Sequence, residues 1–287
     1  IFLIYTQAFY QTLMESFMRI LILSLAIGIL VACSADKTPT SEQTALQSDK
    51  QKPILIGDPI EGLRVASRVG CNGCHGKDAG GQVFFESEEE GLIVAPNLTK
   101  QRHLYNDTQL ERLLRGGITH DGHRPLGMPV FMFQYLSNRE IRDINAWLHS
   151  LPDVTNTDLP EKRWSEKLIQ QLKNGSYPYD DDLPDPNIQS PSIPPTEQLA
   201  LGKHIAYSSC TECHGRELNG WGPDDDTPSL IVAKAYTPEL FARLMKTGIT
   251  ANGEESKSGL MTKMGRTRFS VLTEQEVSAL KAYLDSR

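Results

Sequence analysis

Aromatic residues and an excess of positive charge are both lacking in this chain of 287 residues. Phe, Trp and Tyr make up 7% of the sequence, which is little for one large hydrophobic core. Lys and Arg number 29 against 36 for Asp and Glu, so the formal net charge is −7. Because nucleic-acid phosphates are bound by basic surfaces, this charge disfavours nucleic acid as a partner. A hydrophobic share of 39% and a charged share of 23% exclude general disorder and a polytopic membrane protein.

A long hydrophobic run is also lacking, and the uncharged stretch at 20–33 (ILILSLAIGILVAC) is shorter than the ~20 residues that a membrane-spanning helix needs. Because it follows Arg19, it resembles a secretory signal peptide. Its end, LVAC, is similar to the lipobox of bacterial lipoproteins, in which the cysteine becomes the lipidated first residue. We therefore expect a signal and lipobox segment at 1–33 and a lipid anchor at Cys33, on the periplasmic side of a bacterial membrane. The alternative is one uncleaved anchor at 1–31, which also places the rest of the chain outside the cytoplasm.

Two segments lack the periodicity of packed elements. Residues 34–56 are rich in Ser, Thr, Gln, Lys and Asp, and we interpret them as a flexible tether. Residues 152–196 hold eight of the 17 prolines and are predicted to be a linker. Within this linker, 161–173 (EKRWSEKLIQQLK) is predicted to form a short amphipathic helix that packs on a domain. Its apolar stripe would consist of Trp164, Leu168 and Leu172.

Two parts of the chain repeat each other. Residues 71–76 (CNGCHG) and 210–215 (CTECHG) carry the same C-x-x-C-H-G motif. Three later features recur at similar offsets, so that only small loop changes separate the copies. We therefore predict two tandem copies of one domain, at 57–151 and 197–287. The recurring features are RGGIT at 115–119 and KTGIT at 246–250, LSNREI at 136–141 and LTEQEV at 272–277, and WL at 147–148 and YL at 283–284.

Each copy has the pattern of a helical domain. A helix at about 61–69 and another at about 197–208 are predicted to lead into the two cysteine pairs. The last helix of each copy begins with a capping box, S-x-x-E at 137–140 and T-x-x-E at 273–276. Alternating strand-type runs are scarce. The fold class predicted from these patterns is all-α.

The C-x-x-C-H motif is compatible with three chemistries. A zinc ribbon needs two cysteine pairs typically ~15–20 residues apart, whereas 135 residues separate these pairs. A thioredoxin-like dithiol needs a βαβ context, which the sequence lacks. Covalent haem attachment has this motif as its signature, and we favour it over zinc and dithiol chemistry. The two cysteines would add to the haem vinyl groups, and the adjacent histidine would be an axial iron ligand. The residues concerned are Cys71, Cys74 and His75 in the first copy and Cys210, Cys213 and His214 in the second.

On these motifs each half resembles a class I cytochrome c domain, and the pair is similar to di-haem cytochromes c that serve periplasmic dehydrogenases. The resemblance implies two tandem all-α domains joined by the Pro-rich linker and two covalently bound haem c groups, which supply much of the core. In that family a proline carbonyl accepts a hydrogen bond from the iron-bound histidine. The matching prolines are Pro96, in APNL, and Pro228, in TPSL.

The resemblance also implies a methionine as the sixth iron ligand, on the loop before the last helix. In the first half Met128, which precedes a proline, fits this role better than Met132, which reads as a core residue. In the second half, internal spacing favours Met264, because it and Met128 each lie eight residues before the leucine of the repeated capping segment. The related second domains place their methionine eight residues before a phenylalanine, here Phe269, which selects Met261. We prefer Met261 and keep Met264 as the alternative.

The function implied is that of an electron carrier and not of an enzyme, either alone or as a subunit of a redox enzyme complex. Electrons would pass from a periplasmic dehydrogenase or another redox protein, through both haems, to a downstream cytochrome or oxidase. The chain would be held at the membrane by lipidated Cys33. One alternative is a di-haem peroxidase-like enzyme with one open haem iron, which would require the loss of one methionine ligand. Another is a haem-bearing sensor or structural subunit.

Overall fold

The computed structural model describes residues 57–155, 158–174, 176, 184–222 and 227–287. The predicted signal and lipobox segment, with Cys33, and the predicted tether at 34–56 lie outside the described residues. Among the residues described, no helix combines the length and the apolar composition needed to cross a membrane. The fold below is therefore that of the two repeats and the segment between them.

The first repeat is built from helices that begin where the sequence provides caps. Helix α2 (Pro59–Arg68) starts after Asp58, whose side chain accepts hydrogen bonds from two backbone N–H groups of the first turn. Helix α7 (Asn138–Ser150) starts after Ser137, which forms the predicted capping box with Glu140. The remaining helices of this repeat are α3 (Cys71–His75), α4 (Leu98–Gln101), η1 (Arg102–Leu104), α5 (Asp107–Gly116) and α6 (Val130–Phe133).

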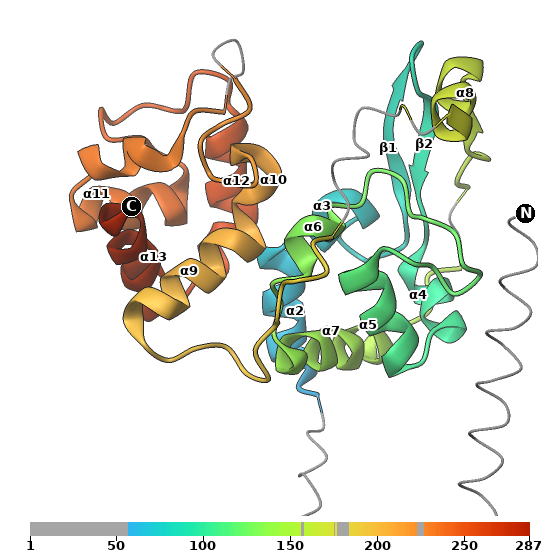
Figure 1. The fold of residues 1–287 in the computed structure, drawn as a ribbon, viewed down its shortest axis with the longest axis horizontal. Helices are drawn as coiled ribbons and strands as arrows, with labels where there is room; N and C mark the ends of the chain where they lie inside the picture. The colour runs from blue at the N-terminus through green and yellow to red at the C-terminus, as the bar shows by residue number, and fades with distance from the viewer. Residues whose placement is uncertain (1–56, 156–157, 175, 177–183, 223–226) are drawn as a thin grey trace, which may run out of the picture. The chain divides into compact units, whose positions relative to one another are not determined.

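The second repeat has the same order of helices (Figure 1). A long helix leads into the cysteine motif, a middle helix ends at a glycine, and a last helix begins at a capping box on Thr273. The predominantly helical fold class expected from the sequence is confirmed. The elements are α9 (Gln198–Ser209), α10 (Thr211–His214), η3 (Leu230–Ala235), α11 (Pro238–Thr247), α12 (Leu260–Thr267), η4 (Phe269–Val271) and α13 (Glu274–Ser286).

Glycines allow the first and last helices of each repeat to cross closely. A Cβ atom on Gly62 of α2 would lie 1.8 Å from the backbone oxygen of Asp143 in α7. A Cβ atom on Gly202 of α9 would lie 2.0 Å from the backbone oxygen of Ala279 in α13. No other residue fits these crossings without moving backbone. Helices α2 and α7 of the first repeat therefore pack against each other in the same way as α9 and α13 of the second.

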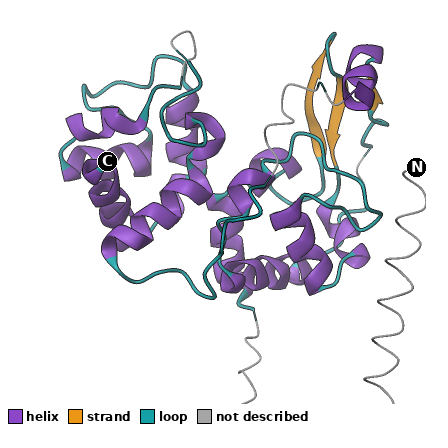
Figure 2. Ribbon diagram, in the orientation of Figure 1, coloured by secondary structure: helices purple, strands orange, loops and turns teal. Residues whose placement is uncertain are grey.

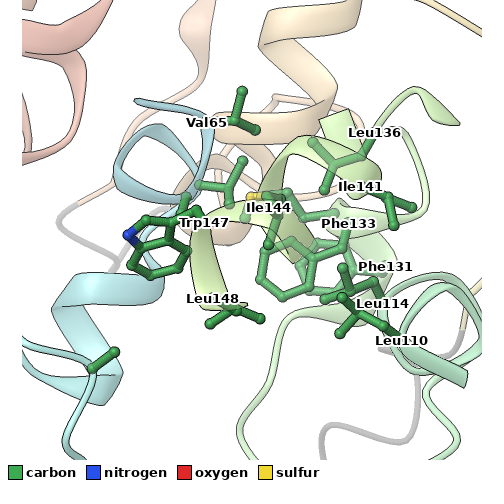
Figure 3. Packing of buried hydrophobic residues seen from close by; sticks show 14 residues of the cluster. Val65, Leu110, Leu114, Phe131, Phe133, Leu136, Ile141, Ile144, Trp147 and Leu148 are labelled. Atoms are coloured by element: carbon green, nitrogen blue, oxygen red, sulfur yellow. The ribbon is translucent and has the colours of Figure 1, made fainter. Parts of the chain in front are cut away.

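Each repeat has its own hydrophobic core. In the first, side chains from α2, α5, α6 and α7 converge on one cluster (Figure 3). The second core is formed in the same way by α9, α11, α13 and the short helices between them. Met128 packs against the first core, while Met261 and Met264 pack against the second, and all three are partly buried.

A three-stranded sheet in the first repeat was not predicted. Strand β2 (Gly91–Ala95) pairs antiparallel with β1 (Gln82–Ser87) and with β3 (Arg163–Trp164), which comes from the predicted linker (Figure 2). The short strands lack a clean alternation of buried and exposed residues, which explains why the sequence pattern did not reveal them. The fold is therefore mostly, but not purely, α-helical.

The linker is packed against the first repeat along much of its described length. Its helix, α8 (Glu166–Asn174), begins later than the 161–173 segment predicted, and Trp164 lies in a strand and not on the helical stripe. Leu168 is fully buried, as expected of that stripe. Further along, the carbonyl oxygens of Pro191 and Ser192 accept hydrogen bonds from the first two N–H groups of α7, at 2.9 and 3.0 Å. The end of the linker thus satisfies donors that a helix N-terminus leaves unpaired.

A buried ionic cluster joins the two repeats, both of which belong to one compact unit. Glu140 of α7 accepts a hydrogen bond from Arg68 of α2 at 2.6 Å and from His204 of α9 at 2.9 Å. All three side chains are buried. Burial alone would raise the pKa of Glu140, but the Arg68 charge and the His204 hydrogen bond hold it well below its usual range. Outside this cluster, Arg64 of α2 pairs with Glu276 of α13 at 2.6 Å.

The close helix crossing generates a stability prediction. We expect Gly62→Ala to lower the free energy of unfolding of the haem-loaded chain by about 1–3 kcal/mol, because the added methyl group meets backbone. Chemical denaturation measures the change. Gly116→Ala is the matched control, since a Cβ there would meet only the Ile118 side chain, at 4.0 Å. Equal stability of Gly62→Ala and Gly116→Ala would contradict the proposed crossing.

The ionic cluster generates a second prediction. Glu140→Gln keeps the capping geometry but leaves two buried basic side chains without a counter-charge, so we expect a loss of about 3–5 kcal/mol at pH 7. Because the folded-state pKa of Glu140 is depressed, wild type should hold this advantage above about pH 4 and lose it as the pH falls further.

Denaturation curves of both haem-loaded proteins at pH 7 and at about pH 3.5 test this expectation. Glu111→Gln serves as the control, because the Glu111 side chain, paired with Arg115, is 47% exposed and should contribute at most about 1 kcal/mol. A Glu140→Gln protein as stable as Glu111→Gln would show that the buried cluster does not hold the repeats together.

Candidate haem attachment sites

The first C-x-x-C-H motif forms a single helical turn. Helix α3 begins after Gly70, which adopts a left-handed conformation with φ of 91° and so turns the chain sharply away from α2. Cys71 and Cys74 are three residues apart on this turn and therefore lie on one face. His75 ends the turn. One short element thus presents two thiols and an imidazole together.

The second motif repeats this arrangement. Helix α10 begins directly at the end of α9, with Cys210 as its N-cap residue, and ends at His214. The segment after each motif is also the same: the N–H of Gly81 donates to the His75 oxygen and that of Gly220 to the His214 oxygen, both at 2.8 Å. The repeat seen in the sequence is therefore a repeat of backbone geometry.

Each histidine is held by a proline carbonyl. Nδ1 of His75 lies 2.9 Å from the backbone oxygen of Pro96, and Nδ1 of His214 lies 2.7 Å from that of Pro228. A carbonyl oxygen only accepts, so Nδ1 carries the proton in each ring, and in the neutral ring Nε2 has the free lone pair. Burial lowers the pKa of His75, which keeps that ring neutral. These are the acceptors that the family resemblance implied, and the tautomer they impose is the one a metal ligand needs.

The loop after each motif contains a strained residue in the same place. Ala79 and Leu218 have φ of 59° and 58° and are fully buried. Their backbone oxygens accept hydrogen bonds from Leu98 and Leu230, both at 2.8 Å. These bonds join the strained residue to the segment just after each proline. The proline carbonyls are thereby fixed relative to the histidines.

The first cysteine of each motif is unsuited to dithiol chemistry. Cys71 and Cys210 are thiols, and burial raises the pKa of each to about 12. Redox-active cysteines have the opposite property, a lowered pKa that exposes a thiolate. No cluster of three or more His, Cys, Asp or Glu side chains suited to a metal ion occurs in the part of the chain that the structure describes. Within the described residues, these properties disfavour dithiol redox cycling and a zinc ribbon.

The methionine candidates lie near the end of the middle helix in both repeats. A Cβ atom on Gly117 would meet Val130 at 3.4 Å, and one on Gly248 would meet the backbone of Thr262 at 2.2 Å. Both glycines are the left-handed C-caps of their helices, so Val130 and Thr262 occupy equivalent places. Counting from them, Met264 corresponds to the fully buried Met132. Met261 lies one residue from the place that corresponds to Met128.

A buried arginine that the sequence analysis did not identify lies beside both motifs. Nε of Arg268 donates to the backbone oxygen of Arg68 at 3.1 Å, and Nη1 donates to Oε2 of Glu212 at 2.5 Å. Glu212 lies inside the second motif, between Cys210 and Cys213. Local sequence gave no signal for this contact, because the Arg68 and Arg268 positions are 200 residues apart.

The residues present fit two haem groups. Each repeat offers two cysteines and a histidine on one turn, with partly buried methionines on a separate segment of the same core. An imidazole nitrogen and a thioether sulfur are both ligands of haem iron. The site residues predicted from the sequence are therefore arranged in two sets, one in each repeat.

Comparison with protein families gives the same division of the chain. The family model described as Cytochrome c matches twice, at residues 60–152 and 199–287. Together the matches cover more than half of the sequence. A comparison with curated proteins found no match.

Proposed function

The chain belongs to the cytochrome c family, and from this premise we propose that it is a di-haem electron carrier that passes electrons from a dehydrogenase-type donor to a downstream cytochrome or oxidase. Domains of this family bind haem c and transfer electrons. The observation that supports two functional sites is the pair of hydrogen bonds from His75 to Pro96 and from His214 to Pro228. Because each repeat has a histidine whose Nδ1 is hydrogen-bonded to a carbonyl oxygen, each repeat has one histidine oriented as a metal ligand.

The first step of the proposal concerns attachment. Cys71 and Cys74 would hold one haem c and Cys210 and Cys213 the other, through thioether bonds to the vinyl groups. When bound, haem supplies an iron that exchanges one electron between the ferric and ferrous states. The protein contributes the orientation of the group, its axial ligands and a low-dielectric surrounding. His75 and His214 would be the histidine ligands.

The second step concerns the sixth ligand. Met128 would complete the first site, because it lies on the core side of the chain just before α6, while Met132 is fully buried among core side chains. Met261 would complete the second, because it packs against the second core and lies eight residues before Phe269, the spacing that the family resemblance implies. Two thioether ligands would leave no open iron position and would stabilise ferrous iron. This arrangement favours a carrier over a peroxidase-like enzyme.

The third step concerns location. The signal-like run and the lipobox-like LVAC sequence support export and a lipid anchor at Cys33, on the periplasmic side of a bacterial membrane. A tether of residues 34–56 would let the two repeats move near that membrane. Confinement raises the effective concentration of donor and acceptor around the carrier. The donor would be a periplasmic dehydrogenase or another redox protein at the same membrane.

Haem content is the direct test of the proposal. We expect full-length protein from a host competent in cytochrome c maturation to carry two covalently bound haems per chain, measured by mass and absorbance. The double variant Cys71→Ser/Cys74→Ser and the double variant Cys210→Ser/Cys213→Ser should each carry one. Colourless wild-type protein with the mass of the polypeptide alone would refute the proposal.

The ligand assignment makes a separate prediction. We expect Met128→Ala and Met261→Ala each to convert one of the two haems from low-spin to high-spin iron and to lower its reduction potential, because a ligand that favours ferrous iron is lost. Met132→Ala and Met264→Ala are the matched controls and should keep both haems low-spin. A high-spin haem in Met264→Ala but not in Met261→Ala would assign the ligand to Met264. A high-spin haem with peroxide turnover in the wild type would favour the peroxidase-like alternative.

A further inference from the structure

One cation is shared by the two proposed haem sites. Arg268 lies between α12 and η4 and is only 8% exposed. Its Nη1 donates to Glu212, inside the second motif, and a Cβ atom on Gly70 would lie 2.9 Å from its Cζ. Gly70 directly precedes Cys71. The guanidinium therefore contacts the start of the first motif and the interior of the second.

Gly70 is what admits the guanidinium. A side chain at that position would also come within 3.1 Å of Nη1 and 3.2 Å of Nε of Arg268. The left-handed backbone at Gly70, needed to begin α3, excludes most other residues as well. The same residue thus permits both the turn into the first motif and the approach of a charge from the second repeat.

Arg268 stays charged in this place. Burial disfavours the cation, but the Glu212 carboxylate raises the pKa of Arg268 above its usual value. Nη2 of Arg268 is buried and has no hydrogen-bond partner within the described residues. An unsatisfied buried donor costs about 1–3 kcal/mol. A role in joining the two repeats does not by itself explain why Arg268 is buried with one guanidinium nitrogen unpaired.

A buried charge acts strongly on a neighbouring redox group. Oxidation from ferrous to ferric iron adds a positive charge to the site, and a fixed cation nearby disfavours that form. The effect is large where water is excluded, because the effective dielectric constant is low. The cysteines that flank Arg268 belong to both motifs, so the same cation would act on both haems.

We propose that Arg268 raises the reduction potentials of both haem sites and that Glu212 opposes it. This inference rests on the proposed function and adds to it the residues that set the driving force between donor, carrier and acceptor. Glu212 lies within the second motif, and its charge also raises the pKa of Cys71 and of Cys74 in the first motif. Both members of the Arg268–Glu212 pair therefore act on the two sites, with opposite signs.

The test is a spectroelectrochemical titration of haem-loaded, full-length variants. At a fixed ambient potential we expect Arg268→Gln to lower the ferrous-to-ferric ratio of both haems by about tenfold, which corresponds to 59 mV for a one-electron couple. Glu212→Gln should raise the potentials of both haems. The double variant Arg268→Gln/Glu212→Gln should lie between the single variants. Opposite signs for the two single changes would support a charge effect.

Two further variants separate charge from structure. Arg268→Lys keeps the charge and should keep potentials near those of wild type, even if some contacts are lost. Arg64→Gln removes another cation that bridges the repeats, through Glu276, and should leave both potentials unchanged. Unaltered potentials in Arg268→Gln, or shifts of the same sign in Arg268→Gln and Glu212→Gln, would overturn the inference. If Arg268→Gln loads no haem, the Glu212→Gln and Arg268→Lys results decide.

The failure of this inference is distinguishable from failure of the proposed function. Wild-type protein with fewer than two haems would contradict the proposed function before any variant is compared. Wild type with two haems, together with an Arg268→Gln protein of unchanged potentials, would contradict only the role of Arg268.

Discussion

The hydrogen bond from a histidine Nδ1 to a proline carbonyl is the constraint on which both sites depend. It fixes the tautomer of His75 and of His214 and holds each ring in place before any ligand arrives. The loop that carries each proline is in turn tied to a buried residue with positive φ, Ala79 or Leu218. A strained backbone persists only where its surroundings determine it, so these loops are built to hold a geometry.

The two repeats preserve this geometry while changing most side chains. Gly62 and Gly202 make the same helix crossing, although the residues they meet, Asp143 and Ala279, differ in chemistry. Ala79 and Leu218 differ in size and adopt the same conformation. The two repeats therefore share a set of backbone positions and short hydrogen bonds, whereas the volumes of the surrounding side chains differ between them.

Structural features that depend on neighbouring residues in the sequence were predictable. Features formed by residues far apart in the sequence were not. Both capping boxes marked the starts of α7 and α13, and the helices predicted at about 61–69 and 197–208 correspond to α2 and α9. The sheet was missed because β3 comes from a segment that has the composition of a linker, and its partner β2 is about 70 residues earlier. Arg268 was missed because nothing in its own neighbourhood indicates Gly70 or Glu212 as contacts.

Charged side chains lie at the contact between the two repeats, although apolar side chains would stabilise that contact at least as well. A buried ion pair contributes little net stability, because desolvation offsets most of the attraction. Yet Glu140 of the first repeat binds Arg68 and, across the contact, His204. Arg268 of the second repeat pairs with Glu212 and donates across the contact to the backbone oxygen of Arg68. An apolar contact of the same shape would join the repeats without creating an electric field at the cysteines. Fixed charges do both, so in this fold the residues that dock one repeat on the other also define the electrostatic surroundings of the sites that the repeats carry.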